Sequence, residues 1–335
     1  MKAVVLEKTD GPRALVIRDV EAPAPGAGEV RVRLEASALN RRDYWITLGR
    51  YPQMQLPCIP GSDGAGIVEA VGPGVAQELL GRDVVIYPAM AWGDDEACFG
   101  PDFRVLGMPD QGTFAESICV PADNVYPKPE HLNWTQAAAI PLAGLTAWRA
   151  CVTHAGVRSG MRVLVTGAGS GVAGFAIRWC LSLGAGVYVT SGDEKKITTA
   201  REMGVSGAES YRDPACYKKL RRQSGGFHAI VDSAGGNDMN PLLDTLLPAG
   251  RYVFFGATLG NPDNGLEMAK LFFRHIRIQG TTMGSNAEFA AMLEHVSRQR
   301  IEPAIDRVMP LDQIADGLQR MADFGQTGKI VLTNR

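Results

Sequence analysis

The chain has 335 residues, 45% of them hydrophobic, which is enough for two domains with ordinary cores. Its 34 basic and 36 acidic residues give a formal net charge of −2, so no global charge attracts nucleic acid or an anionic membrane. The six cysteines show no C-x-x-C spacing, which argues against a zinc clip or a disulfide framework. The opening "MKAVVLEKTDG" lacks an apolar signal core, and no run reaches ~18 apolar residues, so we expect a cytoplasmic protein.

The first part of the chain consists of short alternating runs that Gly and Pro separate. Examples are "MKAVVLE", "EVRVRLEASAL", "GAGIVEAV" and "GTFAESICV". This spacing predicts a mostly β, barrel-like unit over roughly the first 120 residues. From about Leu132 the pattern changes to a helical one, "NWTQAAAIPLAGLTAWRACV", with Asn133 or Thr135 as a plausible cap.

The middle of the chain alternates apolar strands with amphipathic helices. The strands are "RVLVTG", "GVYVTS", "HAIVDSAG", "RYVFFG" and "IRIQGTT". Such alternation predicts βαβ units and a doubly wound parallel sheet, which makes the fold class α/β. The helices and the final strand "GKIVLTN" that follow are expected to return to the first domain.

Two glycine-rich stretches are candidates for a phosphate-binding loop. In "IPGSDGAGIVEAVGPGV", Glu69 stands where the third glycine of G-x-G-x-x-G would be, and the residues that follow suit a strand. In "RVLVTGAGSGVAGFAIRW", Gly169, Gly171 and Gly174 complete the motif between a strand and a helix. There, the first glycine permits a tight turn, the second a close pyrophosphate, and the third close helix–strand packing. We therefore predict dinucleotide binding at the second stretch.

The end of the second strand of this sheet indicates which dinucleotide is bound. An NAD site has an acidic residue at this strand end, where it binds the ribose hydroxyls. Here Ser191 occupies that region, and Asp193 lies slightly beyond the expected position. Lys195 and Lys196 come next, and a 2′-phosphate would gain from them. The alternative is that both lysines face solvent at a helix start. We favour NADP(H).

These features together resemble the medium-chain dehydrogenase/reductase superfamily over nearly the whole length. The resemblance is carried by "GTFAES", "AAAIPLAGLTAW" and the ending "TGKIVL". It implies a β-rich, GroES-like catalytic domain at 1–127 and 268–335, and a Rossmann dinucleotide domain at 128–267. Within the superfamily the chain is most similar to the zinc-free quinone oxidoreductases.

The branch is indicated by the positions at which the family's zinc alcohol dehydrogenases hold their metal. The resemblance places Asn40, Ser62 and Leu142 there, and none is a usual zinc ligand. The four-cysteine structural lobe of those enzymes is also absent, since the corresponding segment contains only Cys98. We expect no metal.

The resemblance also implies functional residues. It places Asn40, Asp43, Tyr44 and Tyr51 at the substrate end of the site, and Trp45 where the family often has a tyrosine. Asp43 could instead be a cap or a salt-bridged residue, and the three aromatic side chains could serve packing alone. The implied cofactor residues are Thr146, Gly169, Gly171, Val172, Gly174, Ser191, Lys196, Tyr211, Ser233, Ala234, Phe255, Gly256 and Ala257.

The implied activity is hydride transfer from NADPH to a quinone or an α,β-unsaturated carbonyl without a metal. The alternatives are a 2-enoyl thioester reductase or a zinc alcohol dehydrogenase on the same scaffold, or a cofactor-binding protein without turnover. The family's open edge strand, here Ile276 to Thr282, further implies a homodimer. A small-molecule substrate is the other expected partner.

Overall fold

The computed structural model describes residues 1–334 and divides into two compact units. One contains Met1–Leu145 and Gly284–Arg335, and the other contains Thr146–Met283. The boundaries fall later in the chain than the predicted 127/128 and 267/268. The reason at the first boundary is that helix α2 (Trp134–Ala138) packs against strands of the first unit.

The first unit is built on a seven-stranded sheet with the order β16-β17-β3-β4-β5-β9, and β8 pairs with β3. Only the contact between β16 and β17 is parallel. The strands are β3 (Glu29–Ala38), β4 (Asp63–Val71), β5 (Asp83–Ile86), β8 (Ser117–Pro121), β9 (Val125–Pro127), β16 (Ile305–Pro310) and β17 (Lys329–Thr333). Two further pairs are β1 (Lys2–Leu6) with β2 (Leu15–Asp19), and β6 (Ala89–Met90) with β7 (Arg104–Val105).

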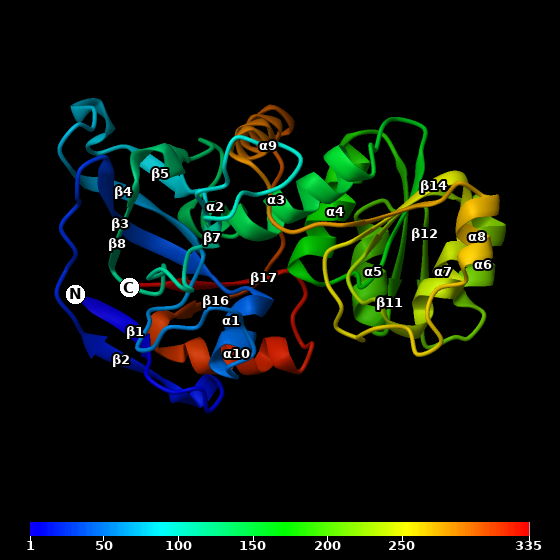
Figure 1. The fold of residues 1–335 in the computed structure, drawn as a ribbon, viewed down its shortest axis with the longest axis horizontal. Helices are drawn as coiled ribbons and strands as arrows, with labels where there is room; N and C mark the ends of the chain where they lie inside the picture. The colour runs from blue at the N-terminus through cyan, green and yellow to red at the C-terminus, as the bar shows by residue number, and fades with distance from the viewer. Residues whose placement is uncertain (335) are drawn as a thin grey trace. The chain divides into compact units, whose positions relative to one another are not determined.

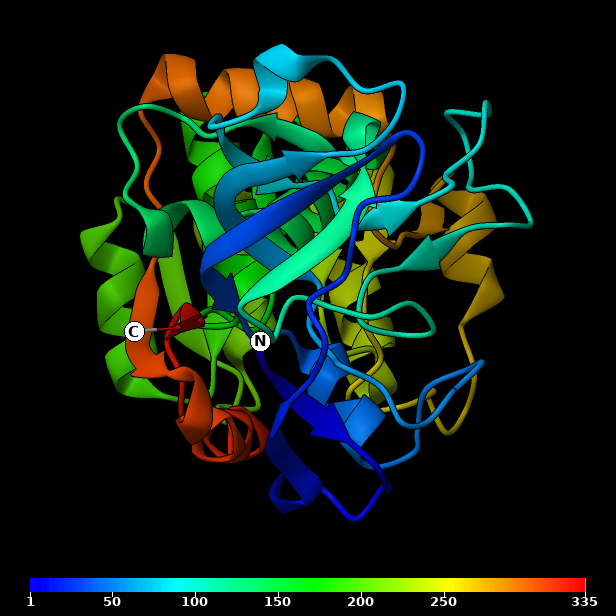
Figure 2. The ribbon, with the colours of Figure 1, turned by 90° about the vertical axis from the view of Figure 1, so that its left-hand side faces the viewer.

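The core of this unit follows from the alternating pattern of β3. Val30, Val32 and Leu34 point inward and are buried, whereas the arginines between them are only partly covered. Strand β8 lies beside β3 (Figure 2) and contributes Ile118 and Val120 to the same core. The helices of the unit are α1 (Arg41–Thr47), α2, α3 (Pro141–Trp148), α9 (Asn286–Gln299) and α10 (Ile314–Ala322), and α3 continues past the boundary between the units.

The glycine-rich stretch that forms β4 serves close backbone packing. A Cβ on Gly66 would lie 2.0 Å from the carbonyl oxygen of Arg33, and one on Gly72 would lie 1.8 Å from that of Gly26. Gly61 adopts φ 101°, which favours glycine. The stretch is therefore part of the β scaffold, as the sequence predicted.

The second unit is a six-stranded, fully parallel sheet in the order β12-β11-β10-β13-β14-β15. Its strands are β10 (Arg162–Val165), β11 (Gly186–Ser191), β12 (Gly207–Ser210), β13 (Phe227–Asp232), β14 (Leu246–Phe254) and β15 (Arg277–Gly280). The order reverses between β10 and β13, so the loops after these two strands meet at the switch point where such sheets bind dinucleotides. This confirms the predicted α/β fold class.

Helices cover both faces of the parallel sheet (Figure 1). Helices α4 (Gly171–Ser182) and α5 (Glu194–Glu202) lie on one face, and α6 (Cys216–Ser224) and α7 (Met239–Thr245) lie on the other. Because both faces are covered, the strands are continuously apolar, as in the "RVLV" of β10. No helix within residues 1–334 is long and apolar enough to cross a membrane.

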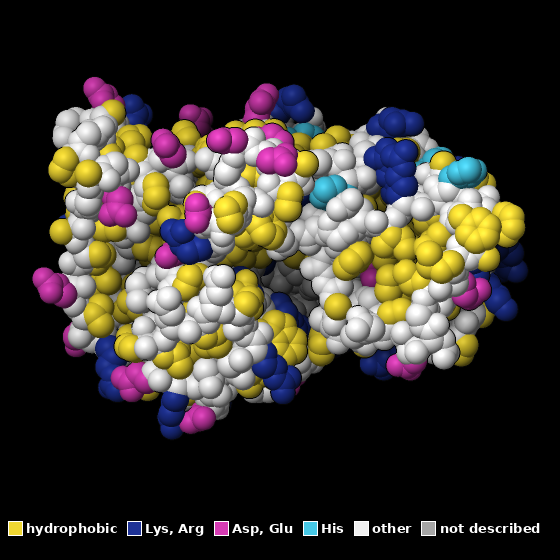
Figure 3. Space-filling model, in the orientation of Figure 1, with side chains coloured by type: hydrophobic (Ala, Val, Ile, Leu, Met, Phe, Trp, Pro, Cys, Tyr) yellow, Lys and Arg dark blue, Asp and Glu magenta, His cyan; other side chains and the backbone are white. Residues whose placement is uncertain are grey.

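The outer edge of the parallel sheet carries an exposed apolar patch. Strand β15 pairs with β14 on one side, and helix α8 (Met268–Phe273) precedes it. Large apolar side chains gather over α8 in Figure 3. The exposed apolar residues of α8 are Met268, Phe272 and Phe273, each 62–76% exposed.

We propose that this edge pairs with a second copy of the chain. An unprotected edge strand invites pairing, and the neighbouring patch would be covered by the same contact. Replacing Phe272 and Phe273 together by Ser is therefore expected to convert a dimer to a monomer, measured by light scattering at micromolar concentration. Leu80→Ser, at an exposed leucine of the other unit, is the control and should leave the mass unchanged. A monomeric wild-type chain would contradict the proposal.

Candidate functional site

The predicted cradle has the geometry of a dinucleotide turn. Gly169 adopts φ 106°, and Ser170 caps α4 by accepting a hydrogen bond from the amide of Ala173 at 3.2 Å. The first amides of this twelve-residue helix, those of Gly171 and Val172, belong to the helix end that attracts phosphate. The prediction that Gly174 permits close packing of helix on strand is wrong. A Cβ added there would contact only the Arg178 side chain, at 3.7 Å.

The three residues predicted to recognise a 2′-phosphate lie beside this turn. Ser191 ends β11 and is buried, and Lys196 lies in the first part of α5. The stem of Lys196 packs so closely on Gly169 that a Cβ there would lie 2.5 Å from Lys196 Cδ. The Tyr211 ring covers Gly192 in the same way, with its hydroxyl 2.4 Å from the position of an added Cβ. The cradle and the predicted phosphate pocket are therefore one contiguous surface.

Asp193, the acidic residue that follows the end of β11, caps the next helix. Asp193 caps α5, and its Oδ1 accepts a hydrogen bond from the amide of Lys195 at 2.8 Å. Its own amide donates to Ser191 Oγ at 3.3 Å. A carboxylate that caps a helix is a poorer partner for the ribose hydroxyls than one left open at the strand end.

The loops after β13 and β14 are organised by one buried carboxylate. Asp232 Oδ2 accepts from the Tyr252 hydroxyl at 2.7 Å and from the Gly235 amide at 2.8 Å, and Thr166 donates to Oδ1. Burial, with Asp232 beside it, raises the pKa of the Tyr252 hydroxyl, which keeps that proton in place. These bonds fix the start of the loop that contains Ser233 and Ala234.

The other predicted cofactor residues lie at the same end of the sheet or in α3. Phe255 donates its amide to the carbonyl of Asp232 at 3.0 Å. Gly256 approaches Ser233 so closely that a Cβ would lie 2.8 Å from its carbonyl oxygen, and Ala257 follows on the exposed side. Thr146 is buried within α3.

In the first unit, Asn40 and Asp43 form the N-terminal cap of α1. The amide of Asn40 donates to Asp43 Oδ2 at 2.7 Å, in a capping box. Asp43 is fully buried, and its Oδ1 has no hydrogen-bond partner within the described chain. Burial raises the pKa of this carboxyl to about 6, against the opposing charge of Arg42. The structure thus gives Asp43 the capping role that the sequence left open as an alternative.

A buried ion pair joins this cap to three other segments. Lys329 Nζ lies 2.7 Å from Asp63 Oδ2 and donates to Asn40 Oδ1 at the same distance. Asn40 Nδ2 donates to Asp63 Oδ2 at 2.9 Å, and the amide of Leu142 donates to Asp63 Oδ1 at 2.7 Å. Both oxygens of Asp63 are therefore satisfied, which a buried charge requires.

The aromatic residues near α1 differ in their surroundings. Tyr44 packs partly buried on an apolar cluster that contains Leu39 and Phe114, and its ring contacts Trp45 at 5.3 Å between centroids. Tyr51 also packs on an apolar cluster, one that contains Ile46, and in addition its hydroxyl accepts a hydrogen bond from Arg42 Nε at 3.1 Å. Of the two predicted tyrosines, only Tyr51 has its hydroxyl placed by a charged group in these contacts.

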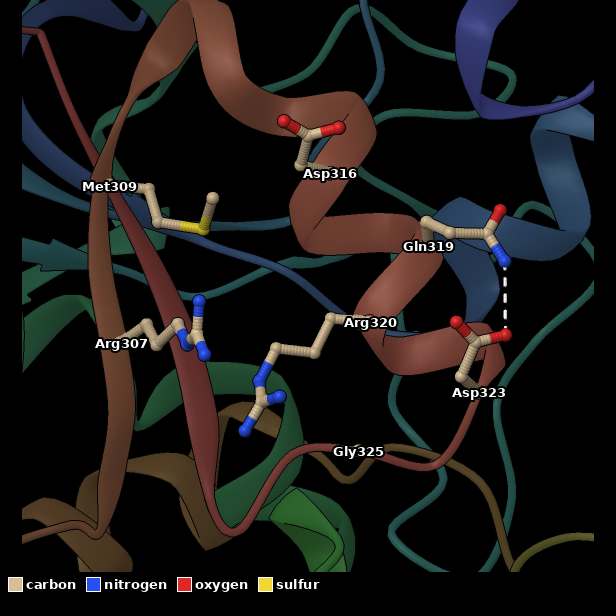
Figure 4. Close-up of a pocket in the computed structure, with 7 residues that line it drawn as sticks. All are labelled: Arg307, Met309, Asp316, Gln319, Arg320, Asp323 and Gly325. Carbon is tan, nitrogen blue, oxygen red and sulfur yellow. Dashed lines mark hydrogen bonds between the residues drawn. The ribbon is translucent and has the colours of Figure 1, made fainter.

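A surface pocket of about 310 Å³ lies elsewhere on the first unit, between β16 and α10 (Figure 4). Arg307 and Arg320 extend into it. Arg320 donates two hydrogen bonds to Asp306, at 2.7 and 2.9 Å, and the pocket contains none of the predicted site residues. Its charges are thus largely paired within the protein.

The switch point, the glycine turn and the residues gathered beside it define a dinucleotide-dependent oxidoreductase with a separate β-rich unit. Residues 26–130 match the family model of the alcohol dehydrogenase GroES-like domain, and residues 171–298 match that of the zinc-binding dehydrogenase. The chain therefore belongs to the medium-chain dehydrogenase/reductase superfamily, and its cofactor is a nicotinamide dinucleotide.

Relatives and solved structures agree with this assignment. A zinc-type alcohol dehydrogenase-like protein of Leptosphaeria maculans is 34% identical, over 94% of this chain and 92% of its own. Another from Schizosaccharomyces pombe is 31% identical over 99% of both chains. The crystal structure of an NAD-dependent alcohol dehydrogenase superposes with a TM-score of 0.94, at 36% identity over the whole of both chains.

The zinc implied by these names does not fit the residues present. Asn40 and Leu142 both contact Asp63, and Ser62 is its neighbour in the chain, so the three expected ligand positions do lie together. They offer an amide, an aliphatic side chain and a hydroxyl, whereas zinc prefers thiolate, imidazole or carboxylate. The Asp63 carboxylate, which lies between these positions, forms an ion pair with Lys329. No group of three or more His, Cys, Asp or Glu side chains within residues 1–334 could hold a metal.

Sequence reasoning missed Lys329, Asp63, Arg42 and Asp232 as organising residues. A signal was present for two of them: Lys329 opens the apolar run "KIVLT", and Asp63 opens the strand "DGAGIV". A charged residue in an apolar strand is rarely buried without a partner. The partners are 266 residues apart, however, so the pair could not be assigned from local pattern.

Removing Lys329 is expected to destabilise the first unit strongly. Lys329→Met leaves Asp63 buried with an uncompensated charge, which should lower the free energy of unfolding by about 3–5 kcal/mol. Urea unfolding followed by tryptophan fluorescence would measure the change. Lys8→Met is the matched control, because Lys8 pairs with Asp10 on the exposed surface and its loss should leave stability nearly unchanged. A small effect for both variants would contradict the role given to the buried pair.

Proposed function

We propose that this chain is an NADPH-dependent reductase that transfers hydride to a quinone or an α,β-unsaturated carbonyl without a metal. The observation that carries the proposal is the polar cluster around Asp63, where the Lys329 ammonium pairs with a carboxylate that lies between the expected ligand positions. Activated acceptors need little Lewis-acid polarisation, whereas unactivated alcohols depend on it more heavily. The relatives' names favour alcohol oxidation as the rival function, and the absence of suitable ligands opposes it.

The bound nicotinamide would supply the hydride, and the chain's residues would supply orientation and a proton. The turn at Gly169 and the start of α4 would hold the pyrophosphate. The loops fixed by Asp232 would form the wall beside the cofactor. In the first unit, the Tyr51 hydroxyl would donate a proton to the reduced substrate, and the hydrogen bond that its oxygen accepts from Arg42 supports this role.

The assay for this function is NADPH oxidation with a panel of acceptors, followed by nicotinamide absorbance. A benzoquinone or a short enone is expected to be reduced, and an enoyl thioester tests the neighbouring activity on the same scaffold. The reverse reaction with a primary alcohol and NADP⁺ should be slow. Turnover of alcohols alone would contradict the proposal, and binding of NADPH without any turnover would favour a non-catalytic role.

NADPH preference is proposed to depend on Lys196. A hydrogen bond between charged groups contributes about 1.5–3 kcal/mol, or roughly 10- to 150-fold in affinity. Lys195 could replace part of this, so Lys196→Ala is expected to weaken NADPH binding by about tenfold and to leave NADH binding nearly unchanged. Nucleotide fluorescence titration would measure both.

The matched control for this pocket is Lys195→Ala, since that side chain is exposed on the same helix end. It should have the smaller effect on NADPH. If the wild-type chain binds NADH as tightly as NADPH, the pocket does not recognise a 2′-phosphate. The solved relative described as NAD-dependent makes this comparison informative.

A further inference from the structure

Arg42 is a partly buried residue that joins several segments of the first unit. Its Nη1 donates to Ser62 Oγ at 2.5 Å and to the carbonyl of Leu106 at 2.6 Å, and its Nη2 donates to the carbonyl of Met108 at 3.1 Å. The Ser62 hydroxyl in turn donates to Leu106 at 2.8 Å. These contacts hold the guanidinium in one orientation, and its Nε donates to the Tyr51 hydroxyl oxygen.

The contact with Tyr51 has two parts. Arg42 Nε lies 3.1 Å from the Tyr51 hydroxyl oxygen, and Arg42 Cζ lies 4.6 Å from the ring centroid. Because the hydroxyl oxygen accepts the guanidinium N–H, its own proton is directed elsewhere and is available to an acceptor.

We propose that Arg42 is the positioning residue of the reaction, acting through Tyr51 as the proton donor. This inference rests on the proposed function and names the residue that positions the proton donor of that reaction. Hydride addition to the β-carbon of an enone, or to a quinone, leaves a negative charge on the acceptor. Tyr51 would give its proton to that anion, its oxygen would become a phenolate beside the Arg42 guanidinium, and a proton from water would restore the hydroxyl.

A purely structural role for Arg42 is the competing explanation, since its three contacts with Ser62, Leu106 and Met108 also join segments of the unit. The two explanations differ in what happens when the Tyr51 hydroxyl is already gone. A residue that acts through this hydroxyl has little left to contribute in a Tyr51→Phe background, whereas a structural clamp would cost the same in both backgrounds.

The test is a double-mutant cycle on the full chain with NADPH and the best acceptor. Tyr51→Phe is expected to lower kcat by about 100-fold or more. Arg42→Met is expected to lower kcat by about 10- to 100-fold, with the KM for NADPH unchanged, and Arg42→Lys should recover part of the loss. In the Tyr51→Phe background, Arg42→Met should change kcat by less than about threefold.

The control is Arg50→Met, which removes an exposed guanidinium that lies 5.9 Å from the Trp45 ring in the same segment. It should leave kcat unchanged. Thermal unfolding of each variant identifies any loss of fold, and Arg42→Lys serves as the variant of choice if Arg42→Met does not fold. Equal losses from Arg42→Met in both backgrounds would overturn the inference and leave the proposed function standing.

A second measurement does not depend on turnover. The ¹³Cζ resonance of Tyr51, assigned by its loss in Tyr51→Phe, is expected to move in Arg42→Met and to stay in place in Arg50→Met. An unmoved signal would overturn the inference. If the wild-type chain reduces no acceptor in the panel, the proposed function fails, and the proton-donor step fails with it. The Tyr51 resonance then decides by itself whether Arg42 controls the Tyr51 hydroxyl.

Discussion

The ion pair between Lys329 and Asp63 is the constraint on which the first unit depends. It is almost completely removed from water, with side-chain exposures of 3% and 0%. Buried charges of this kind are tolerated only when every oxygen and ammonium proton finds a partner in good geometry. Here the partners come from the cap of α1 and the start of α3, so one interaction ties two helices to two strands.

This pair also underlies our proposal that the chain works without zinc. The expected ligand positions lie together around Asp63, but the positive charge among them belongs to Lys329. Ser62, at another of these positions, is bound to Arg42. The chain thus keeps the scaffold of the superfamily, and the polar groups at the expected ligand positions are bonded to residues of the protein itself. Such a site can orient a substrate and supply a proton without a Lewis acid.

Local pattern in the sequence was enough to predict the fold and the position of the glycine turn between β10 and α4. The glycine turn at Gly169 and the apolar strands are signals within a short window, and Lys196 lies near that turn in sequence. The polar cluster of the first unit could not be predicted in the same way, because Lys329 contacts Asn40 across 289 residues. The glycines have two different structural roles. Gly66 allows close packing of two strands, whereas Gly169 adopts a positive φ and contacts Lys196.

The most direct test of a metal-free site is elemental analysis of the purified chain together with its reductase activity before and after a strong chelator. The expected result is no stoichiometric zinc and an unchanged rate of NADPH oxidation with the best acceptor. About one zinc per chain, with activity lost on chelation and restored by added zinc, would contradict the account.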